Sequence, residues 1–403
     1  MTEIDRSLIA DCIHCGFCLP TCPTYGPLWQ EEMDSPRGRI HLMEGLATTT
    51  LPLSATVVEH FDRCLGCMAC VTACPSGVQY DRLIEQTRAY IEERYEREPD
   101  DWLVRAAIFR VFPFPNRLRA ALRLAPLGRL LPLPGRLGTL AELAPPWRSE
   151  EQPPRRTPAA GPRRARVGIL TGCVQRVVFG DVNVATGRVL AAEGCDVIAP
   201  KGQGCCGALH LHAGRREEGV ERARALGALF EEAGAEAIVV NAAGCGSHLK
   251  EAELELPVFD VSEFLAELGP RAARHPLALR VAFQDSCHLA HAQRIRDAPR
   301  ALLRSIPDLE VAEPRDQAIC CGSAGIYNVV QPEAARALGD RKAGHVLETA
   351  PDAYASANPG CLIQVSTALR RAGRPLPAFH PIELLDASIA RADRDELLHR
   401  ARN

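Results

Sequence analysis

Residues 12–23 read CIHCGFCLPTCP, and residues 64–75 repeat the same spacing as CLGCMACVTACP. Both stretches match C-x2-C-x2-C-x3-C-P, which is the cysteine spacing of bacterial proteins that bind two [4Fe-4S] clusters. Two-residue gaps let three thiolates converge on one cluster, and the three-residue gap followed by proline turns the chain toward the other cluster. The two runs therefore predict an α-helical N-terminal module with two [4Fe-4S] clusters.

In this spacing the fourth cysteine of each run ligates the cluster of the other run. The first predicted ligand set is Cys12, Cys15, Cys18 and Cys74, and the second is Cys64, Cys67, Cys70 and Cys22. A pair of zinc sites is the alternative, because CxxC pairs also bind zinc. Zinc takes four ligands and does not need three evenly spaced cysteines followed by Cys-Pro twice over. The spacing therefore favours crossed iron-sulfur ligation.

Polar residues between the two runs are predicted to form a turn and then a helix. Ser35 to Arg39 is turn-prone, and a helix is expected over residues 40–46. Arg37 and Arg39 could offset cluster charge or face a partner, and a solvated surface is the alternative. His14 lies between two predicted ligands. Since no fourth ligand is missing, we interpret it as a neighbour that tunes the cluster.

The composition places these cysteines in a reducing compartment. The chain has 403 residues, 46% of them hydrophobic and 24% charged, with a net charge of −3, which is typical of a globular protein. The opening residues include acidic side chains and no apolar core of a secretion signal. No apolar run approaches the roughly 18 residues that cross a bilayer. Metal ligation or redox chemistry in the cytoplasm is therefore favoured over disulfides for the 17 cysteines, and no nucleic-acid partner is expected.

A helix and then a linker are predicted after the second run. Residues 81–98 are dense in Glu and Arg and are expected to form a packing helix that Pro99 ends. Eleven prolines occur from Pro113 to Pro162, which indicates a linker.

The stretch that leads into this linker has an amphipathic pattern. Trp102, Leu103, Ala106 and Phe109 recur at helical spacing, and residues 101–140 contain seven arginines against one acidic residue. A basic amphipathic stretch can make peripheral contact with an anionic membrane or bind a partner subunit. The alternative is a connector packed on its own protein.

The rest of the sequence is an internal repeat. Each half has a strand leading into a cysteine, then a Cys-Cys-Gly turn, then a second strand leading into a cysteine. The strands are predicted at residues 167–172, 237–241, 279–284 and 352–358, and helices at 185–193, 216–232 and 332–347. Corresponding cysteines lie 114, 115 and 116 residues apart, which indicates a duplication. The alternation of strand and helix predicts two α/β units with parallel sheets.

Thiolates that follow parallel strands can gather at the carboxyl edge of a sheet. The candidate sets are Cys173, Cys205, Cys206 and Cys245, and Cys287, Cys320, Cys321 and Cys361. Adjacent cysteines are too constrained to pair readily with each other and suit a multi-iron centre. Cys195 falls outside the pattern and is predicted to be a small buried residue. Histidines near these loops are predicted to be surface residues, with ligands or proton donors as alternatives: His210, His212, His248, His288 and His291.

A double-cluster module followed by two Cys…Cys-Cys-Gly…Cys units resembles the CCG-domain iron-sulfur proteins. This group includes the iron-sulfur subunits of glycolate oxidase, of anaerobic glycerol-3-phosphate dehydrogenase and of heterodisulfide reductase. The similarity to the glycolate oxidase subunits rests on CIHCGFCLPTCPTYG, DSPRGRI, DRCLGCMACVTACPSGVQY, GCCGALHLHAG, AAGCGSHLKE, CHLAHAQR and CCGSAGIYNVVQPE.

The resemblance implies an electron-transfer subunit that serves an FAD-containing partner subunit. The partner would oxidise a 2-hydroxy acid, glycolate first of all, and a quinone-type acceptor would take the electrons. No G-x-G-x-x-G follows a predicted strand in this sequence, in agreement with a flavin on another chain. The subunit is expected in the cytoplasm or on the inner face of its membrane. Lactate or glycerol-3-phosphate as the partner's substrate, a disulfide reductase, and a redox-sensing scaffold are the alternatives.

One departure from the heterodisulfide reductase pattern affects the second half. Those subunits carry a further cysteine in a closing CxxC, where this chain has His248 and Gln364. Four cysteines per unit leave open an ordinary [4Fe-4S] centre, an empty site or a zinc-filled one, so that one or two further centres could join the two [4Fe-4S] clusters. The expected division is 1–100 for the cluster module, 101–164 for a linker with an amphipathic helix, 165–270 for the first CCG unit and 271–403 for the second.

Overall fold

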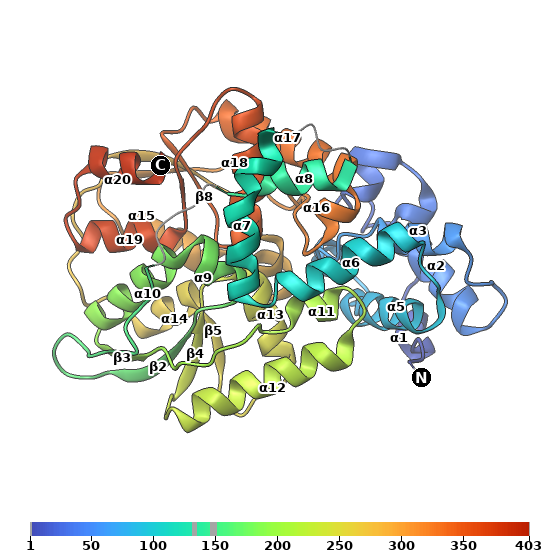
Figure 1. Ribbon diagram of the computed structural model, residues 1–403, viewed down its shortest axis with the longest axis horizontal. Coiled ribbons are helices and arrows are strands. Elements are labelled where there is room, and N and C mark those ends of the chain that lie inside the picture. The colour runs from blue at the N-terminus through green and yellow to red at the C-terminus, as the bar shows by residue number, and fades with distance from the viewer. Residues whose placement is uncertain (1, 131–134, 146–150, 403) are drawn as a thin grey trace.

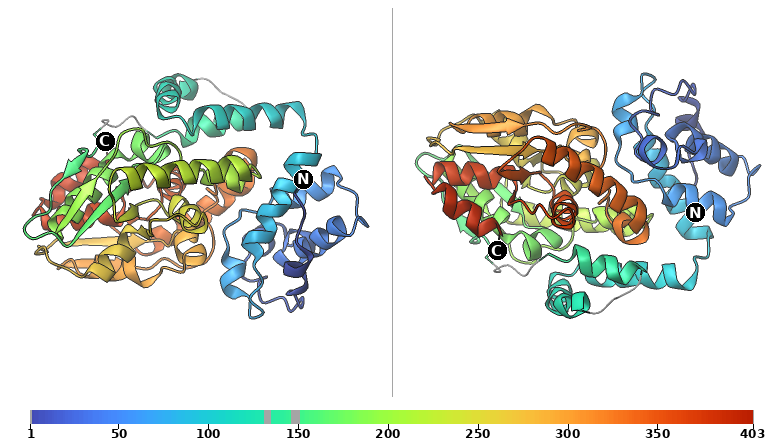
Figure 2. Two further views of the ribbon diagram at one scale, coloured as in Figure 1. Left: turned by 90° about the horizontal axis from the view of Figure 1, so that it is seen from below. Right: turned by 90° about the horizontal axis from the view of Figure 1, so that it is seen from above.

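The computed structural model describes residues 2–130, 135–145 and 151–402. A helical N-terminal module, a helical connector and two α/β units follow one another along the chain (Figure 1). In Figure 2 the N-terminal module, in blue, lies at one end of the body formed by the two units, and the connector helices, in teal, run along one side of that body. None of the helices within the described residues is both long enough and apolar enough to cross a membrane.

Short helices frame the two cysteine runs of the N-terminal module. They are α1 (Arg6–Ala10), α2 (Pro36–Ala47), α3 (Ala55–Asp62), α4 (Ala69–Ala73) and α5 (Tyr80–Arg94). Helix α2 begins earlier than predicted, because Ser35 caps it by accepting a 3.0 Å hydrogen bond from the Gly38 N–H and Pro36 suits the first helical position. Its first turn therefore carries Arg39 into the interior, where only 1% of the side chain is exposed. The alternative prediction, that Arg39 lies on a solvated surface, is therefore wrong.

Three helices form the connector, namely α6 (Pro99–Val111), α7 (Pro115–Leu130) and α8 (Gly135–Leu143). The proline-rich region is therefore more regular than predicted. Pro99 begins α6 and does not end α5, and Pro115 likewise begins α7, since a first helical residue needs no N–H partner. Phe109 of α6 packs against Val329 and Val330 of the second α/β unit. The connector thus packs on its own protein, as the alternative interpretation proposed.

The two α/β units share one strand order. The first sheet runs β1-β3-β2-β4-β5 and the second runs β7-β6-β8-β9; all neighbouring pairs are parallel except β1 with β3. The strands are β1 (Arg156–Thr157), β2 (Ala165–Leu170), β3 (Cys195–Ile198), β4 (Ala237–Val240), β5 (Val258–Asp260), β6 (Leu279–Phe283), β7 (Leu309–Ala312), β8 (Ala353–Ala355) and β9 (Ala378–Phe379). The predicted duplication and parallel sheets are confirmed, and β1 is an added edge strand.

Helices connect the parallel strands in both units. The first unit has α9 (Val174–Val178), α10 (Gly180–Ala192), α11 (Ala208–His212), α12 (Arg216–Glu232), α13 (Ala243–Glu251) and α14 (Val261–Leu268). The second has a π-helical turn (His288–Ala292), α15 (Asp297–Arg304), α16 (Tyr327–Val330), α17 (Pro332–Glu348), α18 (Pro359–Arg371), α19 (Pro381–Ile389) and α20 (Arg394–Arg402).

The two units share one hydrophobic core. Helix α10 of the first unit packs against α19 of the second, and α14 packs against α15. Equivalent positions of the repeat are buried alike, for example Val167 with Val281 and Ile169 with Phe283. This shared core fixes the cysteine loops of one unit relative to those of the other. The division at residues 100, 164 and 270 stays a prediction.

Candidate iron-sulfur sites

The thiols of the first predicted set converge on a cavity that opens to solvent. Cys12, Cys15, Cys18 and Cys74 line it together with Cys70, and its volume is about 410 Å³ with the opening included. Cys15 is exposed. Donors from both runs meet here, so the arrangement fits a cluster ligated by four thiolates.

The second set lies in the interior. Cys22, Cys64, Cys67 and Cys70 are all buried. Burial raises the pKa of Cys67 and Cys70 well above the ordinary thiol value, and the nearby Cys22 thiol contributes to both shifts. Cys22 of the first run is therefore close to thiols of the second run, as crossed ligation requires. Ligation itself stays a prediction.

Both cysteine loops bend in the same way. His14 and Gly16 in the first run have φ of 53° and 84°, and the equivalent Gly66 and Met68 in the second run each have φ of 62°. Left-handed residues next to right-handed ones turn successive backbone N–H groups inward, which favours a negatively charged group at the centre of the loop. His14 thus contributes its backbone conformation to the loop.

A buried cation lies beside the second set, where negative charge is expected. Arg39 donates hydrogen bonds to Thr24 Oγ1 at 3.0 Å and to the His60 carbonyl at 2.6 Å, and its guanidinium lies 3.4 Å from Asp34. Burial by itself would raise the pKa of Cys64, but Arg39 and Arg88 outweigh it and hold that pKa below its usual value. Arg39 therefore lies beside the thiols of the second set, and its role in offsetting cluster charge stays a prediction.

Helix α5 supplies two partners that the sequence did not reveal. The Tyr80 hydroxyl lies 3.6 Å from Cys64 Sγ, and Arg88 donates a hydrogen bond to the Cys64 carbonyl at 2.5 Å. Tyr80 and Arg88 are eight residues apart, so they share the helical stripe that also carries the fully buried Ile84. The four-residue spacing of Tyr80, Ile84 and Arg88 was the feature of the sequence from which these two partners could have been predicted.

The second set adjoins the second α/β unit. Cys67 and Leu65 pack in one apolar cluster with Cys320, and Cys287 borders the same cluster. The Cys320 thiol also lies close enough to contribute to the raised pKa of Cys67. The thiol groups therefore form a series from the exposed Cys15 through the buried second set to Cys320.

The cysteines of each α/β unit occupy equivalent positions. Cys173 follows β2 and Cys287 follows β6, the Cys-Cys pairs lie in loops, and Cys245 and Cys361 are each the third residue of a helix. Cys173 Sγ is 3.5 Å from Cys205 Sγ, and Cys287 Sγ is 3.9 Å from Cys320 Sγ. Side-chain contacts also link Cys206 with Cys245 and Cys321 with Cys361. Both predicted sets are thus brought together, and Cys195 lies apart in β3 as a fully buried residue.

Steric constraints explain why a glycine follows each cysteine pair. Gly207 and Gly322 have φ of 96° and 90°, and a Cβ at either position would lie 2.2 Å from the Gly219 carbonyl oxygen or 2.7 Å from that of Ala335. Only glycine allows this conformation and this approach of a helix to the loop.

Models of two domain families match the chain. A 4Fe-4S dicluster domain matches residues 9–78, and a cysteine-rich domain matches residues 167–250 and 281–366. The probable glycolate oxidase iron-sulfur subunit of Bacillus subtilis is 36% identical to this chain and covers 95% of it and 94% of its own length. The glycolate oxidase iron-sulfur subunit of Escherichia coli is 34% identical and covers 95% of both chains.

The chain belongs to the family of glycolate oxidase iron-sulfur subunits. Lactate utilization protein A of Oceanobacillus iheyensis is a shorter relative, 28% identical over 55% of this chain and 96% of its own length. The family and its domains assign iron-sulfur clusters to the chain as cofactors.

In this family member, the residues that replace the further cysteine of heterodisulfide reductase have structural partners. His248 Nε2 lies 3.1 Å from the Gly219 carbonyl oxygen, and Gln364 donates a 2.8 Å hydrogen bond to the Ala335 carbonyl. These are the same two carbonyls that approach Gly207 and Gly322. Each replacement therefore joins the helix that carries the last cysteine of its unit, α13 or α18, to a helix that follows the cysteine pair, α12 or α17.

The histidines near the cysteine loops are not surface residues. His210, His248 and His291 are buried, and His212 and His288 are partly so. The His212 and His288 rings lie 4.8 Å apart. Burial lowers the pKa of His212 well below its ordinary value and that of His288 to about 4. The sequence-based interpretation was wrong because it treated each histidine as part of an isolated loop.

A buried carboxyl group between α5 and the first unit predicts a pH effect. Burial, with a smaller contribution from Glu251, raises the pKa of Glu85 to about 8 from the ordinary 4.5. The folded state therefore holds the Glu85 proton more tightly than the unfolded state does, and stability falls as pH rises from about 4.5 to about 8. We expect Glu85→Gln to remove this loss.

The stability advantage of Glu85→Gln over the wild type should grow by about 2–3 kcal/mol between pH 6 and pH 9, measured by anaerobic denaturant titration. Glu96→Gln, at an exposed position beyond α5, is the matched control. An advantage for Glu85→Gln that is the same at both pH values would contradict the assignment.

Proposed function

We propose that this chain is the electron-transfer subunit of a cytoplasmic, flavin-dependent 2-hydroxy-acid dehydrogenase whose substrate is glycolate. An FAD-containing partner subunit oxidises the acid, and a quinone takes the electrons. The observation that carries the proposal is the series of thiol groups from the exposed Cys15 to the buried Cys67 and on to Cys320. The series leads from the surface, where a partner can dock, to the interior of the protein.

We assign the two crossed cysteine sets as ligands of two [4Fe-4S] clusters and the eight cysteines of the α/β units as ligands of further centres. Bound iron-sulfur clusters supply one-electron redox chemistry. The protein sets the conditions for it: Arg39 offsets the charge of the buried thiolates, Tyr80 contacts Cys64, and the apolar packing around Cys67 excludes water.

The test is reduction of this chain through its partner. The complex with the flavoprotein is purified anaerobically and mixed with glycolate, and the visible absorbance and EPR spectrum of the iron-sulfur centres are followed. We expect the centres to become reduced only when the flavoprotein and glycolate are both present. Reduction by glycolate without a flavoprotein, or none with it, would contradict the proposal.

Lactate is the second candidate substrate. The similarity to lactate utilization protein A supports it, although that relative covers only 55% of this chain. The same mixing experiment with lactate decides between the two acids, because the faster reduction identifies the partner's substrate.

The exposed apolar residues around Cys15 are the place where we expect the flavoprotein to dock. Ile13 and Phe17 flank Cys15 and are 70% and 66% exposed. Electron transfer slows steeply with distance, so the donor must approach the cluster nearest the surface. The double variant Ile13→Glu, Phe17→Glu should lower the affinity of the two subunits and the rate of glycolate-driven reduction by about tenfold or more.

Reduction of the same variant by dithionite should stay unchanged, because a small reductant needs no docking surface. Leu124→Glu changes an equally exposed leucine on connector helix α7 and is the control. If Leu124→Glu slows glycolate-driven reduction and the double variant does not, the partner docks on the connector.

Trp102 and Leu103 of α6 are exposed too, and we propose that they make peripheral contact with the inner face of the membrane.

A further inference from the structure

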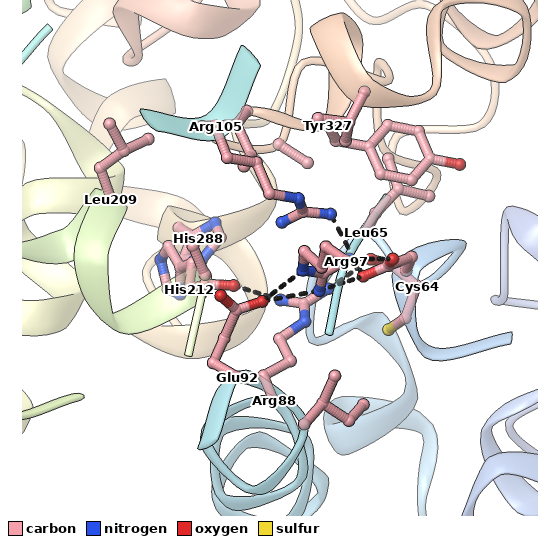
Figure 3. A pocket seen from close by; sticks show the side chains of 16 residues that line it. Cys64, Leu65, Arg88, Glu92, Arg97, Arg105, Leu209, His212, His288 and Tyr327 are labelled. Atoms are coloured by element: carbon pink, nitrogen blue, oxygen red, sulfur yellow. Dashed lines mark hydrogen bonds and ion pairs between the residues drawn. The ribbon is translucent and has the colours of Figure 1, made fainter. Parts of the chain in front are cut away.

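A cavity lies where the N-terminal module, connector helix α6 and both α/β units meet (Figure 3). Its volume is about 590 Å³ with its opening to solvent included. Cys64 and Leu65 of the second cysteine run line one part of it, and His212 and His288 line another. The cavity therefore connects a predicted cluster ligand with a pair of imidazoles.

The two imidazoles come from different halves of the duplication. His212 ends α11 after the first cysteine pair, and His288 follows Cys287 of the second unit. The Nε2 atoms of both rings are buried and have no hydrogen-bond partner in the described part of the chain. Other buried histidines among the described residues also have a ring nitrogen without a partner, but these two lie beside one cavity, where a ligand with polar atoms would supply the missing hydrogen bonds.

Arg88 places a guanidinium at this cavity, whose lining also holds the carboxylates of Asp62 and Glu92, both paired with Arg97. Arg88 donates hydrogen bonds to the carbonyl oxygens of Cys64 and His212, at 2.5 and 2.8 Å, and forms no ion pair with the described residues. The other two arginines of the cavity are neutralised, since Arg97 and Arg105 both pair with Asp62 and Asp101. Figure 3 shows Arg88 between the Cys64 side and the histidine pair.

The rest of the lining suits a flat apolar ring. Leu65, Ile91, Leu209, Ile326 and Val330 contribute apolar side chains to the cavity. Ligand sites combine apolar side chains with polar groups that fix orientation, and this cavity contains both.

We propose that this cavity binds the ring of the quinone acceptor, with its oxygens hydrogen-bonded to His212 and His288. This inference rests on the proposed function. An imidazole nitrogen donates or accepts a hydrogen bond according to its tautomer. A quinone needs that versatility, because its oxygens are acceptors in the oxidised ring and hydroxyl donors in the reduced one. Two electrons from the reduced chain and two protons from water convert the quinone to the quinol.

The experiment measures both binding and turnover of a tail-free benzoquinone. Binding to the oxidised full-length chain is measured by equilibrium dialysis, and the KM for the benzoquinone is measured with the glycolate-reduced complex. His212→Phe removes the hydrogen-bonding atom, and His212→Gln keeps an amide that can replace it. Ala213→Phe fills the cavity, with Leu209→Phe as a milder second filling variant.

We expect His212→Phe and the filling variants to raise both the dissociation constant and the KM for the benzoquinone about tenfold or more, and His212→Gln to recover part of this loss. Reduction of ferricyanide, which can collect electrons at the exposed first cluster, should stay unchanged. His41→Gln and Ala225→Phe change exposed residues of the same types and should behave as wild type. Only preparations whose iron content equals that of the wild type are compared, so that loss of a cluster does not affect the result.

Wild-type affinity for the benzoquinone in both His212→Phe and the filling variants would overturn the inference. Failure of the proposed function would give a different result. In that case neither glycolate nor lactate reduces the chain through a flavoprotein, but the wild-type chain still binds benzoquinone and the His212→Phe variant still binds it more weakly.

Discussion

Cys22→Ala is expected to remove the cluster of the second cysteine run, although Cys22 lies in the first run. The thiol of Cys22 is buried beside Cys67 and Cys70, whereas the other cysteines of its run line the exposed cavity with Cys74. The variant should lose about four irons per chain and all glycolate-driven quinone reduction. Iron and sulfide analysis with EPR measures the loss.

Two reference variants show which of the two clusters Cys22→Ala has lost. Cys15→Ala reports the loss of the exposed cluster, and Cys67→Ala reports the loss of the buried one. The EPR spectrum of Cys22→Ala should match that of Cys67→Ala, and the spectrum of Cys74→Ala should match that of Cys15→Ala. Cys195→Ala is the control, because Cys195 is buried in β3 away from every predicted set. A Cys22→Ala spectrum that matches Cys15→Ala would exclude crossed ligation.

Arg39→Gln should have the largest effect of any substitution outside the cysteines. Arg39 and Asp34 are 1% and 0% exposed, and both lie beside the second set. Asp34 keeps its 2.8 Å ion pair with Arg63, so the loss of stability comes from the buried acceptors that Arg39 leaves without a donor, namely Thr24 Oγ1 and the His60 carbonyl, at about 1–3 kcal/mol each. The lost cation also makes the buried cluster harder to reduce, so its reduction potential should fall. Anaerobic denaturant titration and an EPR-monitored redox titration measure the two effects.

Arg37→Gln is the matched control for Arg39→Gln. Arg37 lies in the same helical turn and pairs with Glu32 at 2.6 Å, but both side chains are substantially exposed. Exposed pairs contribute at most about 1 kcal/mol. Equal losses of stability in the two variants would show that burial of Arg39 is not what matters.

The cysteine sites could be predicted from the sequence because ligand spacing is local. The two N-terminal runs and the repeat offset need no knowledge of distant contacts, and the structure brings each of the four sets together. The parallel sheets followed from the alternation of strands and helices.

Features that depend on distant segments could not be predicted in this way. The burial of Arg39 requires partners from three segments, namely Thr24, Asp34 and the His60 carbonyl. The histidines are buried because the two units and the N-terminal module close over their loops. The amphipathic spacing from Trp102 to Phe109 matches α6, but the proline-rich part of the connector was predicted as irregular because prolines were counted without regard to position, whereas Pro115 begins a helix.

A freeze-quench EPR experiment would test most directly whether electrons pass through this chain. The anaerobic complex of this chain with its flavoprotein is mixed first with glycolate and then with a quinone, and samples are frozen at successive times. We predict that signals of reduced iron-sulfur centres appear after glycolate and disappear after quinone, at rates no slower than turnover. Quinone reduction at the full rate while these centres stay oxidised would contradict the relay.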